Sequence, residues 1–278
     1  MKFLITGSSG FIGSKILKEL INYDSKVKVI LRESFKNKIY NNHENIDYIF
    51  VDDLFNKDVN WWIKVLEGID CVIHSAWYTE PAKYLNSYKN FLCLKVSLNI
   101  LEAMDISKIK YFVGIGTCFE YDFKYSNNDL STSTPLNAKS PYTLAKVSLL
   151  NALKILEKTS DFKFAWCRVF YVFGDGEDER RLVPYIHKML QNSEKVYIKN
   201  GDLVRDYINV EEAGNLIAKI AYKKLSGEFN ICSGKGKKIK NIAMEIGEIY
   251  NKKELIIFKE TKEKDDTPAK IIGKKSDI

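Results

Sequence analysis

Short apolar runs alternate with helix-length amphipathic segments through the first two-thirds of the chain. The runs are rich in β-branched and aromatic residues and occupy positions 2–5, 27–31, 48–51, 71–74, 111–115 and 164–170. Continuous apolar runs of this length are typical of strands buried on both faces. Strands that alternate with helices favour a parallel sheet covered on both faces, and right-handed crossovers then give a doubly wound, Rossmann-like α/β fold.

The pattern loosens after residue 173. A polar stretch covers 174–181, and a helix over 183–191 and a strand over 196–199 follow. The pattern predicts a dinucleotide-binding domain over residues 1–173 and a smaller substrate-binding lobe over 174–278. Residues 228–231 again have the pattern of a buried strand, so we expect the part from about 205 to 232 to return to the main sheet.

Composition narrows the class of protein. No apolar run approaches the ~20 residues that span a bilayer, and the formal charge of +7 comes with no recognised nucleic-acid motif. The five cysteines are scattered without a Cys-x-x-Cys pair, and only three histidines accompany them. We therefore expect a cytoplasmic protein in a reducing compartment, with no metal, no membrane contact and no nucleic-acid partner.

A glycine-rich loop joins the first strand to the first helix. It has the sequence Thr6-Gly7-Ser8-Ser9-Gly10-Phe11-Ile12-Gly13. The first glycine permits a tight turn, the second lets backbone N–H groups approach a pyrophosphate, and the third allows close helix–strand packing. Its place between a strand and a helix favours a dinucleotide site over an ordinary turn. The predicted cofactor-binding residues here are Gly7, Ser9, Gly10, Phe11, Ile12 and Gly13.

The second strand ends at Arg32, which is 32 − 13 = 19 residues past Gly13. An acidic residue at this place would bind a ribose 2′-hydroxyl, whereas a guanidinium suits a 2′-phosphate and stacks on adenine. We therefore predict NADP, with NADPH preferred. NAD stays possible because Glu33 is adjacent, and Arg32 has the alternative of being a solvated strand end.

A second motif opens a later helix. Ser140 is a typical N-cap and Pro141 suits the first turn, and Tyr142 and Lys146 follow four residues apart. On one helical face, the Lys146 ammonium is expected to lower the pKa of the Tyr142 phenol and to bind the cofactor ribose. Tyr142 would then serve as a general acid near neutral pH. The alternative is a surface pair on an amphipathic helix.

A hydroxyl that faces the same crevice should follow a parallel strand, and Thr117 comes directly after the run 111–115. We expect it to orient a substrate carbonyl or alkoxide while Tyr142 gives or takes a proton. Cys118 is adjacent, but no nearby histidine activates it. We interpret it as a pocket wall.

These motifs together resemble the extended short-chain dehydrogenases, the NAD-dependent epimerase/dehydratase family that acts on nucleotide sugars. The resemblance spans nearly the whole chain and rests on residues 6–13, 74–76, 117, 142–146 and 205–210. It implies that Thr117, Tyr142 and Lys146 are the catalytic trio. It also implies that Asp53 and Leu54 border adenine, that Ser75 and Ala76 line the cofactor, that Arg205 meets the substrate diphosphate, and that the segment at Val183 helps to hold the nucleoside.

Departures from the family pattern reduce the number of reactions that fit this chain. The 4,6-dehydratases of this family carry acidic residues directly after the catalytic threonine, where this chain has Cys118 and Phe119. Without that pair, water elimination lacks its proton donor and acceptor, and Glu120 is too far along to be assumed a substitute. Tyr171 replaces a frequent asparagine at the nicotinamide end.

Segments 74–81 and 116–121 most resemble the reductases that make dTDP-fucose, dTDP-6-deoxytalose or CDP-abequose from nucleotide-linked 4-keto-6-deoxy sugars. This similarity implies that Trp77, Cys118, Phe119 and Tyr171 contact substrate; for Trp77, ordinary aromatic packing is an equal alternative. We predict an NADPH-dependent 4-ketoreductase.

Two other functions stay open. The first is a nucleotide-sugar 4-epimerase with tightly bound NAD, and the second is a non-catalytic NADP-sensing regulator on the same fold. Relatives commonly form dimers through the helix that carries Tyr142 and its neighbour, so a homodimer is expected. Leu149, Leu153 and Leu156 would serve either that interface or the core.

Overall fold

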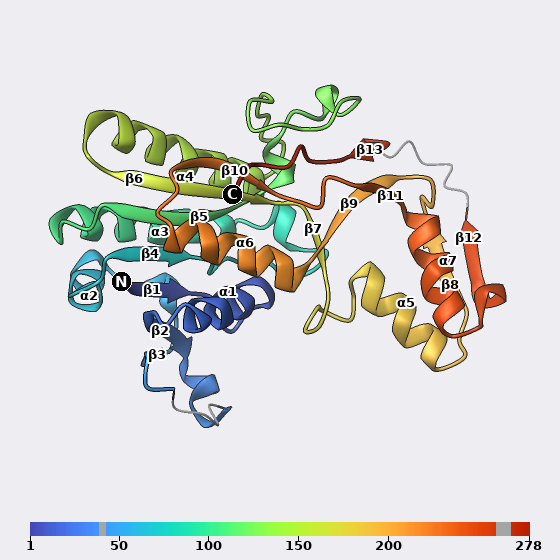
Figure 1. Ribbon diagram of the computed structural model, residues 1–278, viewed down its shortest axis with the longest axis horizontal. Coiled ribbons are helices and arrows are strands. Elements are labelled where there is room, and N and C mark those ends of the chain that lie inside the picture. The colour runs from blue at the N-terminus through green and yellow to red at the C-terminus, as the bar shows by residue number, and fades with distance from the viewer. Residues whose placement is uncertain (39–42, 260–267) are drawn as a thin grey trace.

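The computed structural model describes residues 1–38, 43–259 and 268–278. Its largest sheet has seven strands (Figure 1). The strands lie in the order β10-β6-β5-β4-β1-β2-β3, and each pairs with its neighbours in parallel. Their bounds are β1 Lys2–Thr6, β2 Lys26–Arg32, β3 Ile46–Val51, β4 Cys71–His74, β5 Tyr111–Thr117, β6 Lys163–Val169 and β10 Gly227–Ile231. The expected doubly wound fold is confirmed.

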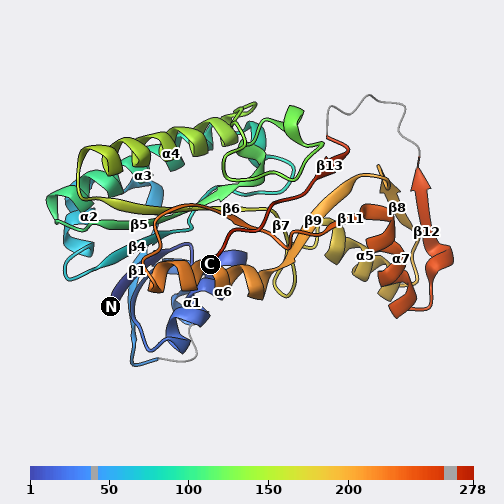
Figure 2. The same cartoon turned by 45° about the horizontal axis from the view of Figure 1, so that its top comes forward.

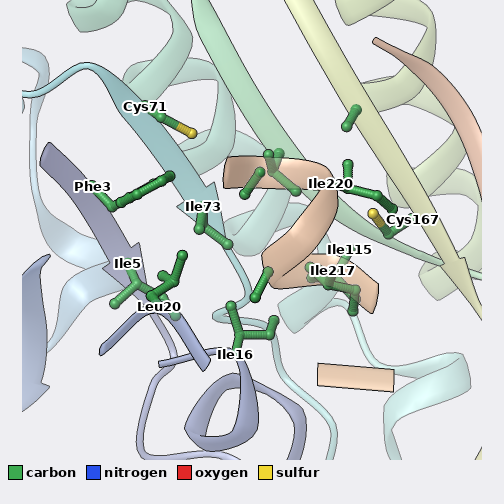
Figure 3. Close-up of a cluster of buried hydrophobic side chains, with 14 of the residues drawn as sticks. Phe3, Ile5, Ile16, Leu20, Cys71, Ile73, Ile115, Cys167, Ile217 and Ile220 are labelled. Carbon is green, nitrogen blue, oxygen red and sulfur yellow. The ribbon is translucent and has the colours of Figure 1, made fainter. Parts of the chain in front are cut away.

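Helices cover both faces of this sheet (Figure 2). Helices α1 (Phe11–Asn22) and α6 (Val210–Tyr222) lie on one face, and α2 (Val59–Val65), α3 (Lys89–Ile106) and α4 (Pro141–Thr159) lie on the other. Figure 3 shows the first face, where Phe3, Ile5 and Ile73 of the sheet meet Ile16 of α1 and Ile217 of α6. Strands buried on both faces explain why their sequences are continuously apolar rather than alternating.

The rest of the chain forms two smaller sheets. Strands β7 (Tyr171–Phe173), β9 (Val204–Asn209), β11 (Gly236–Lys238) and β13 (Lys270–Ile271) make one of them. The other pairs β8 (Val196–Lys199) with β12 (Ile256–Lys259), and α5 (Leu182–Gln191) and α7 (Ile239–Ile249) pack beside it around a separate apolar cluster. Of residues 205–232, α6 and β10 lie with the main sheet, whereas β9 pairs with β7. The division into units 1–173 and 174–278 stays a prediction.

Strand order explains where the cleft forms. From β1 the chain continues to β2 and β3 on one side, whereas β4, β5 and β6 follow on the other. Loops that leave β1 and β4 therefore diverge and leave a crevice at the carboxyl ends of the strands. No helix in the described part of the chain is both long and apolar enough to cross a membrane.

The start of α4 brings Tyr142 to this crevice. The Ser140 Oγ accepts a hydrogen bond from the Thr143 N–H at 3.2 Å, and the Thr143 Oγ1 accepts one from the Ser140 N–H at 3.0 Å. Pro141 occupies the first turn, where its missing N–H costs nothing. The predicted N-cap at Ser140 is confirmed, and it sets the residue at which the helix begins.

Replacing Ser140 with alanine removes this cap. We expect Ser140→Ala to lower the free energy of unfolding by about 1 kcal/mol, measured by urea denaturation. The matched control is Asn151→Ala at an exposed position of the same helix, which removes no cap. Equal stability of the two variants would show that the cap does not determine the helix start.

Candidate active site

A cleft of about 990 Å³ lies at the carboxyl ends of the main-sheet strands. Elements from both halves of the sheet form its walls, together with the segment that leads into α5. All the residues predicted for the site line it except Val183 and Arg205. The fold therefore brings the glycine loop, Thr117, Tyr142 and Lys146 into one cavity.

The glycine loop has the geometry that its spacing predicts. Gly7 has a φ of +72°, a conformation that side chains disfavour, and a Cβ there would lie 2.5 Å from the Ala76 nitrogen. A Cβ at Gly13 would lie 2.2 Å from the Gly7 carbonyl oxygen, so the helix can approach only without one. At Gly10 the only close atom is that oxygen, at 3.2 Å. The loop and the α1 N-terminus thus form a cradle with no side chain in the way, which fits a dinucleotide pyrophosphate.

A chain of hydrogen bonds fixes the loop against β4. The Ala76 N–H donates to the Thr6 Oγ1 at 3.2 Å, and this oxygen lies 2.8 Å from the His74 Nδ1. On the other side of the ring, the His74 Nε2 lies 3.0 Å from the Ser97 Oγ, which itself donates to the Cys93 carbonyl. Burial, aided by the nearby Lys146 charge, lowers the pKa of His74 to about 3. A neutral ring that donates through Nε2 and accepts through Nδ1 satisfies every group in the chain.

The far end of the cleft contains the groups that would meet adenosine. Arg32 is exposed at the end of β2 and lines the cleft, whereas Glu33 is not among the described lining residues. Asp53 and Leu54 follow the adjacent strand β3 and line the cleft wall next to Arg32, and the Asp53 carboxylate accepts a hydrogen bond from the Phe55 N–H at 2.9 Å. A guanidinium beside this wall suits a phosphate on the ribose.

Thr117 and Tyr142 face each other at the other end. Thr117 ends β5 and is buried, and Tyr142 lies edge-on to Tyr84 with ring centroids 4.9 Å apart. We expected Lys146 to lower the pKa of Tyr142, and this is wrong for the described arrangement. Burial raises that pKa, the Tyr84 and Glu120 charges raise it further, and a hydrogen bond with Thr117 lowers it. Desolvation of the phenolate outweighs the other effects.

The Lys146 ammonium is held inside the protein. Its Nζ donates to the Ile115 carbonyl at 2.6 Å and lies 3.5 Å from the centroid of the Trp77 ring. Burial lowers the pKa of Lys146 to about 7, against the charges of Glu120 and Cys93, which raise it. Trp77 therefore contacts the lysine, a role that the sequence did not predict.

Aromatic side chains close the cleft wall beside Thr117. Phe119 packs edge-on against Tyr171, with ring centroids 5.9 Å apart. Cys118 is buried, and its pKa is raised by desolvation and by the Glu120 charge, so its thiol stays protonated. This agrees with its interpretation as a wall residue rather than a nucleophile.

Two predicted substrate residues are not among those that line the cleft. Arg205 is buried, donates to the carbonyl of Val204 at 2.8 Å, and places its guanidinium carbon 5.7 Å from the Tyr171 ring centroid. Val183 packs in the apolar cluster between α5 and α7. Their roles toward a diphosphate and a nucleoside stay predictions.

The cleft also contains residues that the sequence did not single out. Arg181 lies over the Tyr84 ring, with its guanidinium carbon 5.6 Å from the centroid. Burial raises the pKa of Glu177 to about 7, and its Oε2 is buried with no described hydrogen-bond partner. Both lie in the aperiodic stretch before α5, where only the local run of charges could have drawn attention to them.

Comparison with known proteins agrees with this geometry. The sequence pattern of the NAD dependent epimerase/dehydratase family matches residues 3–232. The chain is 26% identical over 265 residues to a dTDP-6-deoxy-L-talose 4-dehydrogenase (NAD(+)) of Aggregatibacter actinomycetemcomitans, covering 91% of this chain and 92% of that protein. It is 23% identical to a CDP-abequose synthase of Salmonella muenchen over 94% of this chain and 80% of that one.

Among solved structures, a UDP-N-acetylglucosamine 4-epimerase from Methanobrevibacter ruminantium M1 superposes with a TM-score of 0.80 and 26% identity. The alignment covers all of this chain and 89% of that one. Within the described residues, no group of three or more His, Cys, Asp or Glu side chains could hold a metal ion. The family match, the glycine cradle and the converging Thr117, Tyr142 and Lys146 together show that this chain belongs to the NAD dependent epimerase/dehydratase family.

Proposed function

We propose that this protein is an NAD(P)-dependent oxidoreductase that reduces the C4 keto group of a nucleotide-linked 4-keto-6-deoxy sugar, with NADPH preferred. The observation that carries the proposal is the wall beside the catalytic trio. Cys118 is buried and Phe119 is aromatic. The first carboxylate after Thr117 in the chain is Glu120, and its oxygens already accept three hydrogen bonds from protein groups. Proton transfer by Tyr142 is therefore available, whereas no free carboxylate directly follows Thr117 to serve water elimination.

The roles of the residues follow from their positions. Thr117 and Tyr142 would hold the oxygen on C4, and Tyr142 would give it a proton as the carbonyl becomes an alcohol. Lys146 would bind the ribose of the cofactor. Phe119, Tyr171 and Tyr84 would keep water from the reacting carbon. The nicotinamide, when bound, supplies the hydride that C4 gains.

A 4-epimerase with tightly held NAD is the second candidate, because the similar solved structure is named a 4-epimerase. It would use the same trio, but it would oxidise and reduce C4 in one turnover and release no altered cofactor.

The five cysteines are buried and free, which supports the proposed cytoplasmic location because disulfides are rare there.

The first test is consumption of NADPH and NADH, followed by absorbance, with dTDP-, CDP- and GDP-linked 4-keto-6-deoxy sugars. We expect oxidation of NADPH with one of them, and a loss of roughly 10²–10⁴-fold in Tyr142→Phe. Tyr125→Phe, at an exposed tyrosine outside the cleft, should keep full activity. Purified protein that carries NAD, interconverts 4-hydroxy epimers and consumes no reduced cofactor would establish the epimerase instead.

The second test concerns the cofactor. We expect Arg32→Ala to raise KM for NADPH about tenfold or more, because it loses a charge-assisted contact to the 2′-phosphate, while KM for NADH barely changes. Lys36→Ala is the matched control, since Lys36 does not line the cleft and lies over Phe50. The similar dTDP-6-deoxy-L-talose 4-dehydrogenase is named for NAD(+). Equal effects of Arg32→Ala on both cofactors, or faster turnover of NADH in the unmodified protein, would overturn the preference for NADPH.

We also propose a homodimer that forms through α3 and α4. Leu149 and Leu153 are buried in the core and cannot face a partner, but Leu92 and Leu98 of α3 and Ile155 of α4 are exposed. Such apolar side chains on neighbouring helices favour an interface.

Ile155→Glu should shift the protein from dimer to monomer in sedimentation equilibrium. Ile249→Glu, at an exposed isoleucine of α7, should stay dimeric, and an unmodified protein that sediments as a monomer would contradict the proposal.

A further inference from the structure

A buried carboxylate lies directly behind the catalytic wall. Glu120 is fully inaccessible to solvent and belongs to the short turn that follows β5. Its Oε1 accepts a hydrogen bond from the Thr117 N–H at 2.8 Å. Its Oε2 accepts one from the Trp166 Nε1 at 2.9 Å and one from the Arg168 Nε at 2.7 Å. Both oxygens are therefore engaged, and one of them holds the backbone of the catalytic threonine.

The guanidinium of Arg168 extends this contact to other strands. Arg168 is buried on β6 and also pairs with Glu228 of β10, which Lys154 of α4 approaches to 2.6 Å. The Arg168 Nη1 donates to the Tyr121 hydroxyl at 3.3 Å, and that hydroxyl donates to the Asn230 Oδ1 at 2.6 Å. The Glu120 carboxylate is thus bonded to groups on β5 and β6, and Arg168 links it to β10.

We propose that Glu120 is a positioning residue of this active site, which fixes Thr117 through its N–H and places a negative charge behind Tyr142 and Lys146. The inference rests on the proposed reductase site, whose groups it orients. Glu120 does not line the cleft, so it acts through its neighbours rather than on the substrate. A burial role alone would not need a charge, because ion pairs in the interior add little net stability compared with apolar side chains.

Electrostatics supports the same role. Burial lowers the pKa of Lys146, and the Glu120 charge is the largest effect that raises it. Other titratable groups that interact with Lys146 are Cys93 of α3 and the neutral His74 of β4. The centroid of the Tyr142 ring lies 5.9 Å from the Lys146 Nζ. Other groups that interact with Tyr142 are Tyr84, Thr117 and Cys118. Removing the Glu120 charge therefore lowers the pKa of both Lys146 and Tyr142, so that each group loses its proton at lower pH.

The test is an NMR titration of Lys146 in protein carrying lysine labelled with ¹³C at Cε, and it needs no substrate. The resonance is assigned by its loss in Lys146→Met. We expect the midpoint in Glu120→Gln to lie at lower pH than in the unmodified protein, and kcat to fall about tenfold or more because Thr117 is misplaced. Glu120→Asp keeps the charge and shortens the side chain, so its midpoint should stay close to that of the unmodified protein while kcat still falls.

Glu228→Gln is the matched control. It removes the other carboxylate of Arg168, but the Glu228 charge is not among the main effects on the pKa of Lys146 or Tyr142, so the midpoint should barely move. An unchanged midpoint in folded Glu120→Gln, or an equal shift in Glu228→Gln, would overturn the proposal.

Should Glu120→Gln not fold, the amide proton of Thr117 in the unmodified protein provides a second test by NMR. We expect that amide proton to be shifted downfield and to exchange slowly, and rapid exchange would overturn the proposal.

Failure of the two proposals can be told apart. A shifted Lys146 midpoint without NADPH consumption on any sugar would refute the reductase and leave the positioning role intact. NADPH consumption with an unshifted midpoint would refute the positioning role alone.

Discussion

The ion pair between Glu120 and Arg168 is the interaction on which the carboxyl edge of the sheet depends. Both side chains are fully buried. Removing Arg168 would leave the Glu120 charge unpaired in the interior at a cost of about 3–5 kcal/mol, whereas Arg168 without Glu120 would keep its second partner, Glu228. The partners of Glu120 and Arg168 lie on β5, β6 and β10, which are consecutive in the sheet. These contacts therefore link three neighbouring strands, and Thr117 is the last residue of one of them.

The same edge combines a constant part with a variable one. The glycine cradle and the Thr117, Tyr142 and Lys146 constellation need backbone geometry and four-residue helical spacing, which tolerate few alternatives. The wall formed by Cys118, Phe119 and Tyr171 needs only to fill space beside Thr117. A family can thus keep its cofactor chemistry while changing which sugar carbon reacts and whether water is eliminated.

Much of this arrangement could be predicted from sequence because it depends on local patterns. Continuous apolar runs indicated the strands of the main sheet, Ser140 and Pro141 indicated the start of α4, and the strand–glycine–helix context indicated the cofactor loop. Arg181 and Tyr84 were missed because their segments are aperiodic and only tertiary folding brings them together. The raised pKa of Tyr142 depends on burial, which the spacing of Tyr142 and Lys146 does not report. Glu120 was set aside for its position after Thr117, because sequence does not show that a short turn directs its carboxylate back to the Thr117 N–H.

The neutral histidine beneath the glycine loop makes the fold sensitive to acid. Folding holds the pKa of His74 near 3, well below its ordinary 6.5. Between these two pH values, His74 is protonated in the unfolded chain and neutral in the native one. The native state is therefore penalised progressively as the pH falls from about 6.5 toward 3. Once the ring is protonated, its Nδ1 can no longer accept from Thr6, and the contact between β1 and the segment at Ala76 loses its orientation. Acid would thus loosen the glycine cradle through a residue that is not among those lining the cleft.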